Sequence, residues 1–73
     1  MAYRDIPIPP GSSNVRSIRY DDSTGTLEAE FVKGDRPYLY FGVPGDVADG
    51  FTTSGLSAGV YLNTRVKNQF PYQ

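Results

Sequence analysis

The chain has 73 residues, a formal net charge of −1 at pH 7, and neither cysteine nor histidine. This length allows one small domain, and the composition excludes a disulfide, a thiolate or imidazole metal site, and the commonest catalytic base and nucleophile. Because the start of the sequence lacks a signal-peptide core and no apolar run could cross a bilayer, we expect a soluble cytoplasmic protein without a metal or cofactor.

Residues 1–11 form a proline-rich segment. Pro7, Pro9 and Pro10 fix their φ angles and donate no backbone hydrogen bond, which excludes a helix or a central strand here. We therefore expect a flexible, extended N-terminal arm, followed by one domain over residues 12–73. The arm either tucks against that domain or becomes ordered on a partner.

Three segments in which apolar and polar residues alternate predict strands. They are residues 13–21, 26–33 and 38–41. In the second segment, Leu27, Ala29 and Phe31 alternate with two glutamates, as in a sheet with one buried and one wet face. The turn sequences DSTG and GDRP separate the segments. Connections this short require antiparallel pairing, so we expect a β-meander.

The sequence after the third strand changes to a helical period. Val47 and Phe51 lie four residues apart and predict a short helix, which Gly55 would end. Residues 57–70 predict a second helix, with Ser57 as its candidate cap. Its apolar stripe consists of Leu62, Val66 and Phe70. The whole pattern predicts an α+β fold, in which a small antiparallel meander of three to four strands packs with one or two short helices.

Tyr38 and Tyr40 present an alternative between core and binding surface. Because neighbouring strand residues point to opposite sides, either this pair or Leu39 and Phe41 must face the core. A buried tyrosine commonly anchors a core through its hydroxyl, whereas an exposed pair could stack on the bases of RNA. The carboxylates of the preceding strand would oppose RNA binding if the tyrosines shared their face, because they repel phosphate.

No arrangement of side chains indicates catalysis. Asp21 and Asp22 are adjacent in a turn and point to opposite sides, and Glu28 and Glu30 lie on the wet face of their strand. The glycine-containing segments lack the Gly-Lys-Ser/Thr pattern of a phosphate-binding loop. We therefore expect no enzymatic activity and no catalytic residues.

Charge is unevenly distributed, with basic ends and an acidic middle. Such asymmetry can steer a partner, and a protein partner is commonly held by aromatic and arginine side chains. The N-terminal side supplies both types. We expect the partner-binding residues to be Tyr3, Arg4, Ile6, Ile8, Arg16 and Arg19. Arg16 and Arg19 would fall on opposite strand faces unless a bulge lies between them.

Several blocks occur together in one order: SSNVRSIRYD, GTLEAEF, YLYFGVP, SAGVYLN and a terminal FPY. In this combination the chain resembles the KTSC domain over residues 12–72. The residues that carry the resemblance are Tyr38, Tyr40, Val43, Pro44, Ser57, Gly59, Tyr61 and Asn63. The chain departs from the pattern at Leu62, where an aromatic residue is usual, and in the glycine-rich segment GDVADGF.

The resemblance implies a domain for which RNA binding has been suggested. In length and single-domain form, the chain also resembles a phage-encoded regulator of this family that binds the β′ subunit of host RNA polymerase. That regulator inhibits transcription initiation and promotes antitermination. By resemblance we expect a monomeric transcription regulator in the cytoplasm of the host bacterium, with an RNA-binding module as the alternative.

Overall fold

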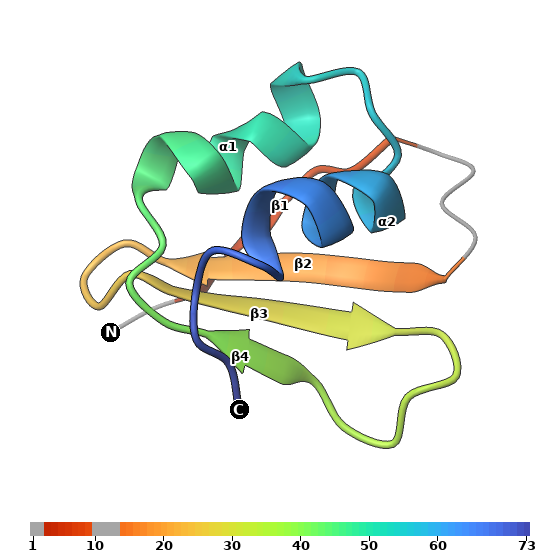
Figure 1. The fold of residues 1–73 in the computed structure, drawn as a ribbon, viewed down its shortest axis with the longest axis horizontal. Coiled ribbons are helices and arrows are strands. Elements are labelled where there is room, and N and C mark those ends of the chain that lie inside the picture. Colours follow the sequence, from red (N-terminus) through yellow and green to blue (C-terminus); the bar gives the residue numbers. More distant parts are fainter. Residues whose placement is uncertain (1–2, 10–13) are drawn as a thin grey trace.

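The computed structural model describes residues 3–9 and 14–73, and it places one antiparallel sheet beneath a layer of short helices (Figure 1). The strands lie in the order β1 (Tyr3–Ile6), β2 (Val15–Asp21), β3 (Thr26–Phe31) and β4 (Tyr38–Tyr40). The helices are α1 (Gly45–Thr53) and α2 (Ala58–Tyr61), and α2 continues into the π-helical segment η1 (Leu62–Val66). The predicted α+β meander is confirmed.

Part of the predicted N-terminal arm is a strand of the sheet. β1 pairs antiparallel with β2, so that Arg4 lies opposite Tyr20 and Ile6 opposite Ile18. The prolines permit this pairing because they all follow Ile6, and because an edge strand needs a partner on one side only. The segment is extended as predicted, but its first described residues belong to the sheet. Residues 1–2 and 10–11 of the predicted arm lie outside the described residues.

β2 contains a bulge at Arg16. The register with β3 shifts between Val15 and Ser17, which leaves Arg16 as the extra residue. Beyond the bulge the strand alternates, with Ile18 buried and Arg19 exposed. The bulge thus removes the strict alternation that would have put the two arginines on opposite faces, and both of them are exposed.

The core lies between the sheet and the helical layer. The sheet contributes Ile6, Val15, Ile18, Tyr20, Leu27, Ala29 and Tyr40, and the helical half contributes Val43, Ala48, Phe51, Ala58, Tyr61, Leu62 and Val66. Burial of these apolar side chains is the main force that stabilises the fold. The hydroxyl of Tyr20 donates to the carbonyl oxygen of Val43 at 2.6 Å, so that the polar end of this large core residue also has a partner.

The predicted end of the first helix and the predicted cap of the second are confirmed, but the second helix is shorter than predicted, because α2 and η1 end at Val66 and not at residue 70. α1 stops just before Gly55, whose φ of 78° lies in the left-handed region that glycine adopts without strain. Ser57 caps α2, because its hydroxyl accepts a hydrogen bond from the backbone amide of Val60 at 3.3 Å. Gly55 and Ser57 thus define the short turn between α1 and α2, after which α2 packs over the sheet.

The C-terminal residues cover the far edge of the sheet. The backbones of Leu39 and Gln73 exchange two hydrogen bonds, of 3.0 and 2.8 Å, and the amide of Phe41 donates to the carbonyl of Pro71. Tyr72 is thereby paired with Tyr40. β4 is therefore not an open edge, and it acquires a third tyrosine on the side of the sheet that faces the helices.

Candidate functional site

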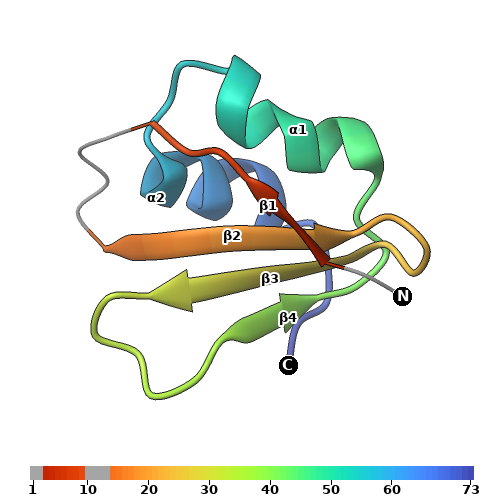
Figure 2. The same ribbon diagram turned by 180° about the vertical axis from the view of Figure 1, so that it is seen from behind.

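Two surfaces of the described chain differ in composition and lie on opposite sides of the sheet. Figure 1 looks onto the helix side, and Figure 2 looks onto the other side, where no helix crosses in front of the strands. We call the second surface the outer face. Its residues include Tyr3, Asp5, Ser17, Arg19, Glu28, Glu30 and Leu39. The exposed bulge residue Arg16 borders them.

Arg19 is the centre of the outer face. Its Nε donates to the carboxylate of Glu28 at 2.6 Å, and its guanidinium carbon lies 5.2 Å from the centre of the Tyr3 ring. The hydrogen bond to Glu28 raises the pKa of Arg19, and the nearby charge of Asp5 adds to this effect. Tyr3 and Arg19 therefore form an exposed cation–aromatic pair, built from residue types that often anchor protein interfaces.

The outer face has mixed charge, although the sequence predicts a basic N-terminal side. Arg19 lies between Asp5 on β1 and Glu28 on β3, and Glu30 lies on the same side of β3. The sequence pattern did not reveal this pairing, because the two acids come from different strands. The outer face is therefore unlike a phosphate-binding surface, which needs cations without neighbouring carboxylates.

Arg4 points to the helix side and holds three elements together. Its Nε donates to Asp22 at 2.7 Å and its Nη2 to Asp49 at 3.1 Å, and its guanidinium carbon lies 5.6 Å from the centre of the Tyr20 ring. The hydrogen bonds to Asp22 and Asp49 raise the pKa of Arg4. This predicted partner-binding residue thus joins β1 to the β2–β3 turn and to α1.

Ile6, which the sequence analysis placed among the partner-binding residues, lies in the core and not on the surface. Ile6 is 4% exposed and packs in the core opposite Ile18, because alternate residues of β1 must face the helices. Ile8 is half-buried and packs against the same core. Between them, the carbonyl of Pro7 accepts a hydrogen bond from the hydroxyl of Thr52 at 2.5 Å. The apolar residues of the predicted arm therefore attach it to the domain.

Tyr38 and Tyr40 share the helix side of the sheet and not the side of the glutamates. Tyr40 lies opposite Leu27 and Tyr38 opposite Ala29, two core residues of β3. Tyr40 is 1% exposed, whereas Tyr38 is 39% exposed. The core alternative is confirmed for Tyr40, while Tyr38 remains at the surface. The predicted repulsion between the glutamates and phosphate does not apply here, because the two groups lie on opposite faces.

Tyr38 is part of a continuous row of aromatic rings. Its ring meets that of Phe31 edge-on, at 5.3 Å between centroids, and stacks on that of Tyr72 at 5.6 Å, with 15° between the planes. Tyr72 also contacts Tyr40 at 5.5 Å. Tyr72 is 54% exposed. We call these four residues the aromatic row, and its middle presents open ring surface to solvent.

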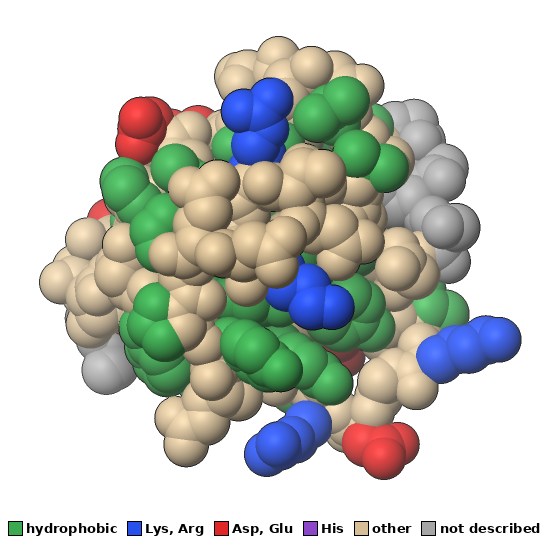
Figure 3. Space-filling view, viewed as in Figure 1, with side chains coloured by type: hydrophobic (Ala, Val, Ile, Leu, Met, Phe, Trp, Pro, Cys, Tyr) green, Lys and Arg blue, Asp and Glu red, His purple; other side chains and the backbone are tan. Residues whose placement is uncertain are grey.

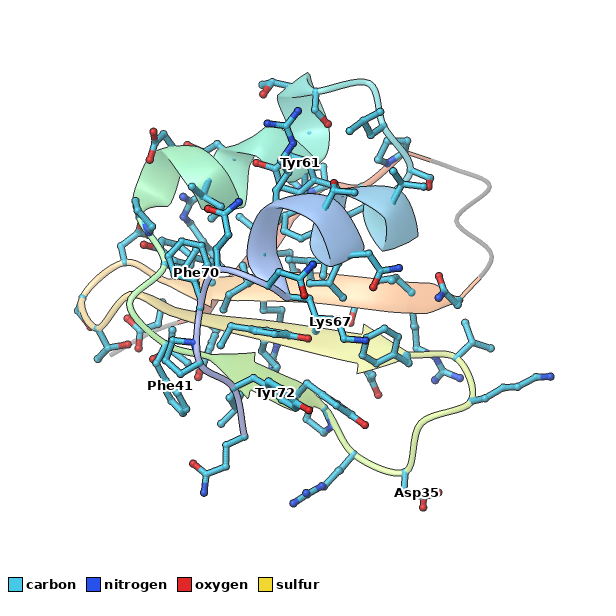
Figure 4. All side chains as sticks on the ribbon, viewed as in Figure 1. Asp35, Phe41, Tyr61, Lys67, Phe70 and Tyr72 are labelled. Carbon is cyan, nitrogen blue, oxygen red and sulfur yellow. The ribbon has the colours of Figure 1, made fainter. Side chains whose placement is uncertain are left out.

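A groove of about 340 Å³, lined by both aromatic and polar side chains, lies between the aromatic row and the helical layer. It is lined by Asn14, Phe31, Tyr38, Tyr40, Leu62, Asn63 and Lys67. Lys67 extends from the end of η1 towards the sheet (Figure 4). In the space-filling view, a basic side chain lies across the hydrophobic surface on this side of the molecule (Figure 3). We call this feature the aromatic groove.

The hydroxyl of Tyr40 reaches the groove. Every buried side-chain nitrogen or oxygen of the described residues has a hydrogen-bond partner, but no described residue bonds to this hydroxyl. Because a fully buried hydroxyl would need a partner, the 1% of Tyr40 that is exposed must include its hydroxyl. This agrees with the place of Tyr40 in the groove lining. Burial of the ring raises the pKa of Tyr40, and the neighbouring Tyr72 and Tyr38 contribute in the same direction.

The cations near the groove are unpaired, in contrast to Arg4 and Arg19. Within residues 3–9 and 14–73, those two arginines make all the ion pairs. Lys67 lines the groove, Lys33 lines an adjoining hollow that shares Asn14 and Phe31, and neither has a carboxylate partner. No acidic residue follows Asp49 in the sequence. Two ammonium groups without an ion-pair partner among the described residues therefore lie beside the aromatic surface.

Most of the serine–glycine–aromatic–asparagine motif has a structural role. Gly50 and Gly59 each permit a close approach: a side chain on Gly50 would collide with Tyr61, and one on Gly59 would collide with Asn14. The hydroxyl of Tyr61 donates to a carbonyl of α1 at 2.8 Å. The glycine-rich segment that departs from the expected pattern thus makes room for the aromatic residue of the motif. Asn63, the last residue of the motif, is exposed in the groove.

The sequence did not identify Phe31, Asn14, Tyr72 or Lys67 as candidates for binding. The available signals were the terminal FPY block and the absence of acids after residue 50, which could have drawn attention to the C-terminal end. The clustering itself depends on the pairing of residues 71–73 with β4. This pairing has no periodic pattern and cannot be predicted from local sequence.

The described part of the chain holds no group of three or more His, Cys, Asp or Glu side chains that could bind a metal ion. None of its helices combines the length and the apolar character that a bilayer span requires.

Comparisons with known proteins agree with the fold. The family model of the KTSC domain matches residues 11–70. A crystal structure of a KTSC domain protein from Yersinia pestis is similar to this chain, with 30% sequence identity and a TM-score of 0.81; the match covers 99% of this chain and 96% of that one. No curated protein matches the chain significantly. β1 precedes the residues that the family model matches.

Proposed function

The chain belongs to the KTSC domain family, and we propose that it is a phage-encoded regulator that binds bacterial RNA polymerase. In this proposal the protein contacts the β′ subunit, inhibits transcription initiation and promotes antitermination in the cytoplasm of the host. It acts as a monomer by binding alone, without catalysis or a cofactor. The choice of partner follows the resemblance to that regulator stated from the sequence.

The observation that carries the proposal is the exposed Tyr3–Arg19 pair on the uncovered side of the sheet. An aromatic ring beside an arginine can enter a partner's pocket and hydrogen-bond at its rim, and both residue types are enriched at interface hot spots. Arg16 protrudes from the bulge on the neighbouring strand and supplies a second cation. We therefore place the polymerase contact on the outer face, with Tyr3, Arg16 and Arg19 as its anchors.

The charge of the outer face favours a protein partner over a nucleic acid. Glu28, Glu30 and Asp5 would meet phosphate groups with like charge, whereas they can pair with basic side chains of a protein. Arg4, Ile6 and Ile8 support this surface from behind. Their contacts with α1 and the core hold β1 in place, so the anchors are fixed before the partner arrives.

Retention on immobilised RNA polymerase, and on a β′ fragment, tests the proposal. We expect the double variant Arg16→Ala/Arg19→Ala to bind at least about tenfold more weakly, because each anchor contributes roughly 1 kcal/mol or more. The matched control is Arg36→Ala/Arg65→Ala, which removes the same charge from exposed arginines outside the outer face. Thermal melts of both variants check that the fold is intact.

The regulatory part of the proposal needs a transcription assay. On a template with a promoter and a terminator, the wild-type protein should reduce initiation and increase read-through, and Arg16→Ala/Arg19→Ala should do neither at the same concentration. The proposal fails if the folded wild-type protein is not retained by polymerase, or if the two double variants bind equally well.

A further inference from the structure

We infer that the aromatic groove is a docking site for an extended, proline-rich segment of a partner protein, with an acidic residue next to the prolines. This site goes beyond the proposed polymerase contact, because it uses different residues on the other side of the sheet. Three properties of the groove point to this occupant: ridged aromatic rings, hydrogen-bond donors without acceptors, and two ammonium groups without carboxylates.

The aromatic rings form ridges and not a flat platform. Phe31 meets Tyr38 edge-on, with 81° between the planes, whereas Tyr72 stacks on Tyr38 with 15° between the planes. Tyr38 and Tyr72 are 39% and 54% exposed, so their edges and faces are open to a ligand. Aromatic-lined grooves of this kind recognise polyproline II helices, which have three residues per turn and present the flat rings of proline on their surface.

The polar groups of the groove are donors that lack acceptors. The side-chain amides of Asn14 and Asn63 and the hydroxyl of Tyr40 line the groove, and none of them donates a hydrogen bond to a described residue. A polyproline II backbone makes no internal hydrogen bonds, so its carbonyl oxygens are free to accept from these groups. A helix has already used most of its carbonyl oxygens within itself, and it fits such a set of donors less well.

The size of the groove favours a segment that is already extended before it binds. Its volume of about 340 Å³ is at the small end of binding pockets, so it can bury only a few side chains of a partner. Such a limited contact leaves little free energy for ordering a flexible chain. Because proline fixes its φ angle, a proline-rich segment loses less conformational entropy on binding than other extended peptides do.

Charge defines the flank of the segment and disfavours a nucleic acid strand. Lys67 lines the groove, Lys33 lines the adjoining hollow, and neither has a carboxylate partner among the described residues. One or two acidic residues beside the prolines would pair with these ammonium groups. A nucleic acid strand carries a phosphate at every nucleotide, and the net charge of −1 on the whole chain opposes association with such a polyanion.

Fluorescence anisotropy of the full chain with a labelled peptide of two Pro-Pro-Leu repeats followed by two glutamates tests the inference. We expect saturable binding, which should be lost or greatly weakened when alanine replaces the prolines of the peptide. Tyr38→Ala should weaken binding at least about fivefold, because it removes a ring that lines the groove. Tyr72→Ala, at the more exposed ring of the row, is a second variant, and thermal melts check that both are folded.

A second peptide, with two glutamines in place of the glutamates, tests the role of charge. Lys67→Gln should weaken binding of the glutamate peptide about threefold, as expected for an exposed ion pair, and should leave binding of the glutamine peptide unchanged. Arg65→Gln is the matched control, because Arg65 is an exposed cation of the same segment that does not line the groove. It should leave the affinity for both peptides unchanged.

Three results would overturn the inference: no saturable binding of the glutamate peptide, equal affinity of wild type and both tyrosine variants, or amide shift changes that the peptide causes only outside the groove. A single-stranded oligonucleotide that binds there while the peptide does not would also overturn it, as would a dimer of the chain that buries the groove. Failure of the proposed function looks different, because polymerase is then not retained although the peptide binds.

Discussion

The outer face and the aromatic groove lie on opposite sides of one sheet, and their cationic side chains differ in whether they are paired with carboxylates. On the outer face, Arg19 is matched by Glu28 at 2.6 Å and is flanked by Asp5. In the groove, Lys67 has no carboxylate partner among the described residues. The comparison shows that a basic end of the sequence need not form a positive surface, because Arg4 and Arg19 near the N-terminus are paired with carboxylates. Cross-strand neighbours decide which cations are neutralised and which stay available.

The two surfaces also differ in how their aromatic residues are supported. Tyr3, on the edge strand β1, has its ring contact with one arginine, Arg19 of β2. Tyr38 and Tyr72 instead belong to a row of rings that ends at the buried ring of Tyr40. The groove should therefore depend on the core more strongly than the outer face does. The following predictions test this difference, from the largest expected effect to the smallest.

Tyr40→Ala should lower the free energy of unfolding by about 3–5 kcal/mol, because it leaves a cavity under the aromatic row. Tyr38→Ala should cost only about 1 kcal/mol, since it removes edge contacts between exposed rings. Urea denaturation of both variants measures the difference. Equal losses would show that the two tyrosines have the same structural role, although Tyr40 is 1% exposed and Tyr38 is 39% exposed.

Ile6→Ala should lower the free energy of unfolding by about 2–4 kcal/mol, because the side chain is removed from the core opposite Ile18. An exposed position on the same strand, Asp5→Ala, is the control and should change stability by less than about 0.5 kcal/mol. If Ile6→Ala were as mild as its control, β1 would not be held by the core. The outer face would then form only on its partner.

Asp21, at the end of β2 beside the outer face, should make stability depend on pH. Its carboxylate accepts hydrogen bonds from the hydroxyl of Ser23 at 2.6 Å and from its amide at 2.9 Å, which lower the pKa of Asp21. A group whose pKa is lower in the folded state contributes stability above its unfolded pKa of about 3.9, and this contribution is lost as the pH falls through the folded pKa.

Wild type should therefore exceed Asp21→Asn in unfolding free energy at neutral pH, and the difference should shrink below a pH of about 4. Urea denaturation at several pH values measures this difference. A gap between the two proteins that is the same at every pH would contradict the role of the Ser23 hydrogen bonds. Such an effect should leave the aromatic groove unchanged, because Asp21 does not line it.

Local patterns predicted much of the fold but little of the groove. Alternation in residues 26–31 identified the inward residues of β3, and the cap at Ser57 and the stop at Gly55 set the helix ends correctly. These features depend on neighbours in the sequence. Ile6 was assigned to the surface because prolines concealed a short edge strand, and its burial depends on pairing with β2.

The groove depends on contacts between distant segments. Tyr72 reaches Tyr38 only because the C-terminal residues pair with β4, and Lys67 reaches the sheet only through the return of α2 and η1. Likewise, the pairing of Arg4 with Asp49 bridges 45 positions of sequence. No periodic signal records such contacts, so the sequence left open whether Tyr38 and Tyr40 belong to the core or to the surface.

Amide chemical-shift mapping of the labelled chain with a β′ fragment of RNA polymerase tests the proposed contact most directly. The β′ fragment should shift resonances of Tyr3, Arg16 and Arg19. No response of the outer face, or shifts confined to the residues of the aromatic groove, would contradict the proposal.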